Sequence, residues 1–440
     1  MKRLAPFLLM YLLTLVLCRP VWAATVNDEP AWMDRLRQGF SCRLRVVGYG
    51  MWTGVADRDR NPGNRIMHLP DQTAALQLRP DLRLDTDRLS LLLQPRAELY
   101  RESRGRGPEA GEDEWRDDTF VHQWLVRWRC TDTLYVSYGR ENLQWGPAYL
   151  TALSNPFFED NGKSNPEIEV DTTDFARAVW VPGPSWSFSL IANTSRGRQE
   201  PVDRDFTRTY ALKVDYTGSA DYGGVILTRR ENTFNEISGF YGRTVSDALL
   251  VYAEGALQNG TSAQYPLETD SPLGVSLSER KRSDTTWIGS VLAGASYTFE
   301  SGPTLTLEYL HDGPGDDGEE AGAFYDLQAR AADAIRDMTP LASLGYQALG
   351  ATADPGLRFL RQNYLMLQYV QTDIADTIDL TLRCTRNLDD GSRRISFIGG
   401  WFVGDHLKLF AVGTLDNGSR RSEFGDIIDY QAMFGMMLIF

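Results

Sequence analysis

Beyond residues 1–23, the sequence lacks any apolar run long enough to cross a membrane as a helix. Such a helix needs about 20 predominantly apolar residues, whereas 24% of this chain is charged and its mean hydropathy is -0.34. A helical membrane protein is therefore excluded. The membrane architecture that this composition still permits is a closed β-barrel, because there every backbone polar group is paired between strands.

Histidine is scarce, and its scarcity bears on catalysis. The four histidines are scattered along the chain (His68, His122, His311 and His406), and no two have the spacing of metal ligands. No serine lies in a nucleophile elbow. We therefore expect no enzyme activity, no cofactor and no metal. A barrel enzyme is the most remote alternative, since outer-loop acids and histidines can serve a barrel protease.

Cysteine and lysine are rare as well. Beyond residues 1–23, three cysteines remain in predicted strands (Cys42, Cys130 and Cys384), a pattern that fits neither a disulfide framework nor a metal site. Only four lysines remain there (Lys163, Lys213, Lys281 and Lys408), so the positive charge is almost all arginine, whose planar fork fits carboxylates and phosphates. The net charge of -14 excludes a nucleic-acid-binding protein.

The N-terminus has the pattern of a secretory signal peptide. Lys2 and Arg3 precede an apolar run, and Val21-Trp22-Ala23 places small residues at a cleavage site. The apolar run is shorter than a membrane span. We expect a signal peptide over residues 1–23, a short periplasmic lead-in over 24–39 that is too short for a plug domain, and one barrel over 40–440.

The stretch Gln72–Arg101 shows the pattern around which the chain is organised. Apolar residues occupy alternate positions in two runs (Leu76, Leu78, Leu82 and Leu84, then Leu91, Leu93, Ala97 and Leu99), with polar residues between them. Period two is typical of β-strands, and the polar turn at 85–88 makes the pair a hairpin. Each run exceeds the usual strand of about 5–6 residues and suits a tilted membrane-crossing strand of about 9–11 residues.

The same hairpin recurs to the C-terminus and predicts an all-β chain, a single antiparallel barrel of about eighteen strands. Short turns alternate with mostly long hydrophilic connections, as in barrels of the Gram-negative outer membrane, which have short periplasmic turns and longer outer loops. A soluble sandwich or propeller would explain the alternation but not this asymmetry. The final strand ends on Phe440, and a terminal aromatic resembles the signal read by the outer-membrane assembly machinery. The expected partners are that machinery, outer-membrane lipid, lipopolysaccharide and, in one interpretation, polysaccharide.

Residues Gly313–Ala353 form the longest interruption of the pattern. An acidic cluster opens it (Asp312, Asp316, Asp317, Glu319 and Glu320), and Phe324–Met338 has the spacing of an amphipathic helix. Carboxylates suit a hard divalent cation, but the spacing matches no calcium loop. A solvated charged surface is the preferred interpretation.

The most distinctive motif follows a predicted strand. Tyr138-Gly139-Arg140-Glu141 leads into Trp145-Gly146-Pro147, and Leu153–Phe158 continues the segment. This motif resembles a segment of porin-like and alginate-export barrels, in which a strand ends in Gly-Arg-Gln or Gly-Arg-Glu before a loop that enters the lumen. It also resembles Wzi-type capsule-assembly barrels, although the lead-in here is too short for their periplasmic helical bundle. A plain Gly-Pro turn is the alternative interpretation.

Together these patterns favour an outer-membrane channel for passive passage of small or oligomeric hydrophilic, anionic, saccharide-type solutes. The alternative is a barrel that exports or attaches a surface polysaccharide. If apolar faces meet lipid, polar faces meet the lumen, and convergent arginines there favour anions. The residues expected to line the pore or bind ligand are Arg79, Arg83, Arg96, Arg127, Arg129, Arg140, Glu141, Trp145, Phe157, Phe158 and Arg383.

The segment Leu143–Asp171 is expected to fold into the lumen and set its constriction. Its length and its aromatic residues motivate this prediction, because a loop inside the barrel must pack against the wall. Phe157 and Phe158 would supply that packing, and Glu159 and Asp160 would face Arg127 and Arg129 across the pore, creating a transverse field.

Overall fold

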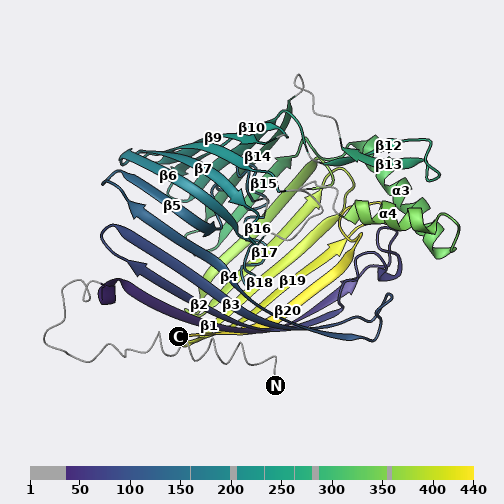
Figure 1. The fold of residues 1–440 in the computed structure, drawn as a ribbon, viewed down its shortest axis with the longest axis horizontal. Coiled ribbons are helices and arrows are strands. Elements are labelled where there is room, and N and C mark those ends of the chain that lie inside the picture. The colour runs from purple at the N-terminus through teal and green to yellow at the C-terminus, as the bar shows by residue number, and fades with distance from the viewer. Residues whose placement is uncertain are drawn as a thin grey trace.

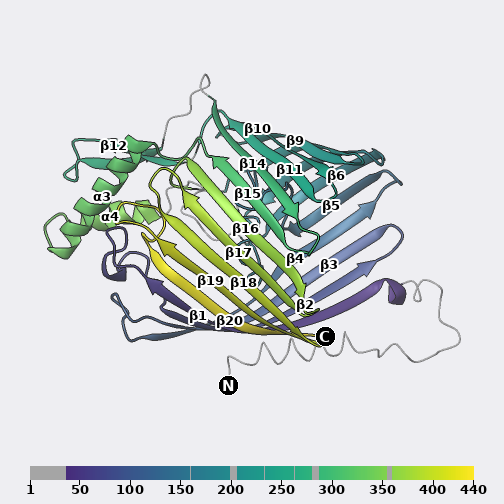
Figure 2. The same cartoon turned by 180° about the vertical axis from the view of Figure 1, so that it is seen from behind.

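The computed structural model describes residues 36–158, 160–198, 206–231, 233–261, 263–279, 287–353 and 359–440. They form an 18-stranded antiparallel sheet that closes on itself where the first strand pairs with the last (Figures 1 and 2). The barrel strands are β1 (Phe40–Val55), β2 (Gln72–Asp85), β3 (Leu89–Ser103), β4 (Asp113–Arg129), β5 (Leu134–Glu141), β6 (Thr173–Gly183), β7 (Trp186–Ser195), β8 (Thr209–Thr217), β9 (Asp221–Arg230), β10 (Asn235–Ser246), β11 (Leu249–Gln258), β14 (Ile288–Thr298), β15 (Thr304–His311), β16 (Asn363–Ile374), β17 (Ile378–Asn387), β18 (Arg393–Val403), β19 (Leu407–Asn417) and β20 (Ile428–Ile439). The predicted fold class and strand number are confirmed.

The connections divide the barrel into two ends. Short turns join β2 to β3, β4 to β5 and β16 to β17 at one end, which we call the short-turn end. The longest connections lie at the other end, which we call the outer end, and the helices over 318–336 and 342–353 lie there (Figure 1). The predicted signal peptide and most of the lead-in lie outside the described residues and stay predictions.

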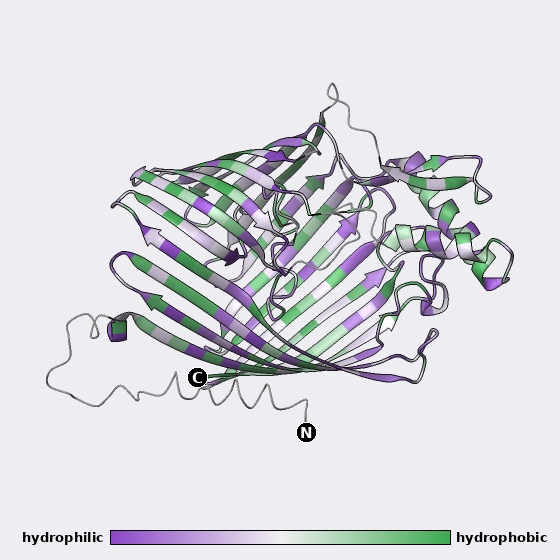
Figure 3. Cartoon of the chain, in the orientation of Figure 1, coloured by the Kyte–Doolittle hydropathy of each residue, from purple (hydrophilic) through white to green (hydrophobic). Residues whose placement is uncertain are grey.

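Side chains alternate between the two faces of the wall, as the period-two pattern predicts. On β17 and β18 the outward ladder pairs Ile378 with Trp401 and Leu382 with Phe397, and all four side chains are exposed. Figure 3 shows the corresponding apolar bands across the strands. A band of exposed apolar side chains on a closed barrel is the surface that lipid covers. Among the described residues, no helix is both long and apolar enough to span a membrane.

The wall also contains an irregularity that positions the site. The register of β3 against β4 shifts between Gln94 and Pro95. Proline has no backbone N–H to donate to the ladder, so it is placed at such bulges. The shift lies beside Arg96, whose side chain turns inward beneath the lumenal loop described below.

Four elements at the outer end form what we call the outer cap: the hairpin of β12 (Gln264–Glu268) and β13 (Val275–Glu279), and the helices α3 (Gly318–Arg336) and α4 (Ala342–Ala353). Leu327, Ala331 and Ile335 of α3 pack on Leu349 of α4 and Val275 of β13. The predicted helix at 324–338 is present but begins earlier. The second helix and the hairpin were not predicted, since both were assigned to loops.

The earlier start of α3 explains part of the acidic cluster. The carboxylate of Asp317 accepts hydrogen bonds from the N–H groups of Glu319 and Glu320, and Glu320 accepts one from the N–H of Asp317. This capping box satisfies donors that a helix leaves unpaired. Within the described residues, no group of His, Cys, Asp or Glu is arranged to hold a metal ion.

The lumenal loop as the candidate functional site

The connection between β5 and β6, residues 142–172, lies inside the barrel, and we call it the lumenal loop. Its contacts with the wall are spread around the ring of strands, although they do not follow the order of the loop's residues. Trp145 lies beside Lys213 of β8, Ser154 beside Ser238 of β10, and Tyr149 beside Glu308 of β15. Later residues reach β17, β19 and then β1 to β3. The predicted entry of this segment into the lumen is confirmed by these contacts.

Two wall carboxylates hold the first half of the loop by its backbone. Glu254 on β11 accepts hydrogen bonds from the N–H groups of Ala148 and Ser154, at 3.0 and 3.1 Å. Glu308 on β15 accepts them from Tyr149 and Leu150, at 2.7 and 2.8 Å. Bonds from backbone N–H groups to a carboxylate are about twice as strong as neutral ones. The two glutamates therefore fix the loop's path against that wall.

Apolar side chains attach the same half of the loop to the wall. Phe158, which is 5% exposed, packs with Leu143, Phe175 and Ile191, and Phe157 and Trp145 cover the cluster. The rings of Phe157 and Phe175 lie edge to face with centroids 4.9 Å apart. The expected packing role of Phe157 and Phe158 is confirmed. Because these rings pack on the wall, they do not face a solute, which argues against their expected role in binding a ligand.

Trp145 is held in the same way. Its indole N–H donates to the carbonyl of Ser154, and the Lys213 ammonium lies 5.1 Å from the ring centroid. Glycine at 146 is required here, because its φ is +85° and a Cβ would lie 2.3 Å from Glu254. The Trp-Gly-Pro motif thus shapes the turn that places two loop amides on Glu254.

The second half of the loop crosses the lumen. Arg383, which is buried on β17, donates to the carbonyl of Lys163 at 3.0 Å. Glu167 pairs with Lys408 of β19 at 2.6 Å, and its carbonyl accepts from Arg79 of β2 at 3.1 Å. Three strands that lie close together in the ring, β17, β19 and β2, therefore hold Lys163 and Glu167.

Glu169 completes the crossing with a network of charges. Both its carboxylate oxygens accept from Arg96 of β3, at 2.7 and 2.8 Å. The Nη2 of Arg96, which donates to Glu169, also donates to Asp81 at 2.9 Å, and Asp81 pairs with Arg45 at 2.8 Å. The side chains of Arg96 and Arg79 are 0% and 3% exposed. Bidentate pairing of this kind is what allows an arginine to be buried.

This burial corrects part of the expected pore lining. Arg79, Arg96 and Arg383 do point inward, but the loop covers them, so they brace the loop and do not face a solute. Glu141 is likewise buried on the inner wall and pairs with Arg177 at 3.2 Å. Alternation alone could not predict these contacts, because it gives the face of the wall on which a side chain lies but not what covers that side chain.

Three expected residues remain accessible at the short-turn end. Arg83 is 60% exposed and pairs with Asp85 beside the turn between β2 and β3. Arg127 and Arg129 are among the last residues of β4, before the turn to β5. The expectation that Glu159 and Asp160 face Arg127 and Arg129 fails for Asp160, whose carboxylate binds the N–H of Gly162 within the loop. Glu159 lies outside the described residues. The acids that cross the lumen are Glu167 and Glu169.

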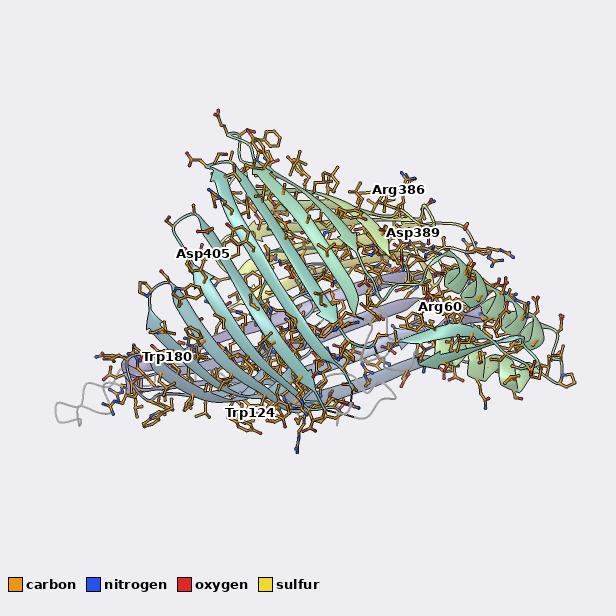
Figure 4. The ribbon with its side chains drawn as sticks, turned by 90° about the horizontal axis from the view of Figure 1, so that it is seen from above. Arg60, Trp124, Trp180, Arg386, Asp389 and Asp405 are labelled. Carbon is orange, nitrogen blue, oxygen red and sulfur yellow. The ribbon has the colours of Figure 1, made fainter. Side chains whose placement is uncertain are left out.

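Arg140 is a second correction, because it does not face the lumen. It lies directly opposite Trp124 on β4 and Asp174 on β6, and Tyr138, two residues before it, packs edge to face on Trp124. Trp124 appears at the outside of the wall in Figure 4. Arg140 binds Asp174 at 2.7 Å. Residues directly opposite on paired strands share a face, so Arg140 is an outward residue near the outer rim.

Several important residues were missed by sequence reasoning. Glu254, Glu308 and Lys408 each stand at inward positions of otherwise apolar or small-residue strands. A lone charge in such a strand is the signal that could have identified them, because it must find a partner. Glu167 and Glu169 gave no such signal, since a loop has no period that fixes the direction of its side chains.

No protein-family model and no curated protein sequence matches the chain. Three solved structures are similar in fold. OccAB1 from Acinetobacter baumannii has a TM-score of 0.53 and 10% identity, covering 91% of this chain and 95% of that one. OccK11 (OpdR) and the outer membrane protein OprD, both from Pseudomonas aeruginosa, have TM-scores of 0.52 with 11% and 8% identity; they cover 92% of this chain and 97% and 94% of their own. This similarity confirms the expected barrel fold.

Proposed function

We propose that this chain is a porin-like channel for passive passage of hydrophilic solutes across the outer membrane, with the lumenal loop as its constriction. The observation that carries the proposal is the path of the loop, whose contacts run around the whole ring from β8 to β3. A loop that merely connected two strands at the surface would need no partners on the opposite wall. The similar structures named above are of the same barrel class, which supports this choice.

We keep the expected preference for anionic, saccharide-type solutes in the proposal, but we attribute it to other arginines than those buried beneath the loop. At the crossing, Arg96 is already paired with both Glu169 and Asp81 and is fully buried. Arg83, Arg127 and Arg129 at the short-turn end are accessible, with Asp85 as a local acid. We therefore assign any anion preference to this mouth, where unburied cations raise the local concentration of anions.

Planar-bilayer recording of the purified protein tests the proposal. We expect stepwise conductance and a reversal potential that indicates anion selectivity in a salt gradient, with the selectivity decreasing at high salt. The rival function is a closed barrel that holds or exports a surface polysaccharide. A barrel that is electrically silent while binding polysaccharide would support the rival and refute the channel.

A further inference from the structure

Two arginines face each other on the outside of the barrel. Arg386 of β17 is the direct cross-strand partner of Arg393 of β18. Both continue the outward ladder in which Leu382 opposes Phe397 and Cys384 opposes Ile395, and both side chains are exposed. Figure 4 shows Arg386 at the outer edge of the wall. The pair therefore points away from the lumen, toward the membrane.

This pair has no ion-pair partner among the residues that the structure describes, although other charges nearby do. Arg394, the next residue, faces inward and pairs with Asp416 at 2.6 Å. The turn between the two arginines holds Asp389 and Asp390, but their carboxylates accept from backbone N–H groups, of Gln362 and Asn363 and of Ser392 and Glu423. Like charges directly opposite on two strands are destabilising, so the arrangement calls for an anion from outside the chain.

Two other outward arginines near the rim are neutralised within the protein. Arg140 binds Asp174 at 2.7 Å, and Arg101 binds Asp113 at 2.6 Å. Unlike these two, Arg386 and Arg393 stand directly opposite another arginine. Two guanidinium forks whose Cβ atoms are about 5 Å apart can converge on one tetrahedral oxyanion with several charge-assisted hydrogen bonds.

The surroundings of the pair indicate where that oxyanion comes from. Next to it on the same face lie Leu365, Ile395 and Leu415, which are 37%, 42% and 54% exposed. The ladder continues from there to Trp401 at the short-turn end. Both arginines stand at the outer end, since β17 ends at Asn387 and β18 begins at Arg393. A cation pair directly above an apolar strip matches an amphiphile with a phosphate head and acyl chains.

We propose that Arg386 and Arg393 bind the headgroup phosphate of a lipid in the outer leaflet, with its acyl chains along the apolar ladder of β17 and β18. The phosphate neutralises the like-charged pair, and the apolar ladder excludes ions that lack a hydrophobic part. The site lies on the opposite face of the wall from the lumenal loop, so it is independent of solute passage.

Native mass spectrometry of the detergent-solubilised protein with diphosphoryl lipid A as the probe tests this site. R386Q/R393Q is expected to weaken lipid binding roughly tenfold or more, because two charge-assisted contacts are lost. R65Q/R101Q is the matched control, since it removes two exposed positive charges at the same end of the barrel, and it should bind like the wild type. R386K/R393K, which keeps the charges but not the forks, should fall between them.

Three results would overturn the proposal. The first is equal affinity of R386Q/R393Q and the wild type, with both showing the heat-modifiable gel migration of a folded barrel. The second is an equal loss in the control, which would mean that only net charge matters. The third is displacement of the lipid by equimolar inorganic phosphate, or equally tight binding of a dephosphorylated lipid with the same acyl chains.

Discussion

At the scale of single residues, the inward arginines act mainly as partners of the loop's carboxylates. Arg96 is fully buried, and Glu169 and Asp81 together occupy its fork. A buried guanidinium without such partners would cost several kcal/mol. Arg96, Glu169 and Asp81 therefore form a unit, to which Arg45 and Arg79 add further ion pairs, and removing one member should affect the others.

Replacing Glu169 with glutamine tests this coupling. We expect E169Q to lower the free energy of unfolding by about 3 kcal/mol, because Arg96 stays buried and loses its bidentate partner. The double variant R96Q/E169Q should lose less than the sum of the two single variants, as measured by urea unfolding in lipid vesicles. Additive losses would show that the two side chains do not act together.

The arginines at the short-turn mouth give a second prediction at this scale. Neutralising two of them in R127Q/R129Q should shift the reversal potential toward cation selectivity. The shift should be larger at 0.1 M than at 1 M salt, where the Debye length falls from about 10 Å to about 3 Å. R243Q is the control, since Arg243 lies at the same end of the barrel but on the outward face, opposite Asp221 and Val251 on the neighbouring strands. A similar shift in R243Q would refute the assignment.

At the scale of elements, the strands could be predicted because their apolar residues recur with a period of two. Long alternating runs predicted the barrel strands, because the lipid and the lumen impose opposite polarity on successive side chains. The hairpin of β12 and β13 has strands of only 5 residues each, too short for a visible alternation. Arg140 was placed inward on its motif, although the alternation of its own strand, through Tyr138, indicates the outward face.

The position of the lumenal loop inside the barrel could be predicted from the sequence, but the wall residues that it contacts could not. Its aromatic residues indicated a buried segment, and Phe157 and Phe158 do pack on the wall. Which acid meets which arginine depends on the path of the loop around the ring, and no local pattern encodes that path. The predicted acids were the ones nearest the aromatic pair, whereas Glu167 and Glu169, further along, reach the opposite wall.

The outer cap should respond to pH through Asp426, in the connection between β19 and β20. Its carboxyl is fully buried beneath the cap, 3.8 Å from Arg60, which in turn donates to the Thr352 carbonyl at the end of α4. Figure 4 places Arg60 beside the cap helices. Burial raises the pKa of Asp426 from 3.8 to about 6, despite the lowering effect of Arg60.

The sign of the effect follows from this shift. Between pH 3.8 and about 6 the folded chain keeps a proton that the unfolded chain releases, so the contribution to stability is greatest below that window and is lost as the pH rises through it. Limited proteolysis of the cap should therefore be slower at pH 4 than at pH 7. D426N should remove most of this difference, and an unchanged pH dependence in D426N would rule out Asp426 as its source.

At the scale of the whole molecule, one closed sheet presents two unlike surfaces. The outward face is an apolar band with a cation pair at its outer edge, and the inward face carries the charges that hold the lumenal loop. The wall closes by its own hydrogen bonds, so the barrel can form without the loop, although the loop's ion pairs with the wall add to its stability. Loop changes therefore should leave the fold intact while altering passage.

The most direct test of this account is the single-channel conductance of a variant lacking residues 155–165, compared with the wild type in the same bilayer. The deletion removes the Phe157–Phe158 anchor and the Lys163 contact to Arg383, so the loop can no longer follow the wall. We predict a several-fold higher conductance with unchanged heat-modifiable migration. A folded variant with the conductance of the wild type would contradict the claim that the lumenal loop sets the constriction.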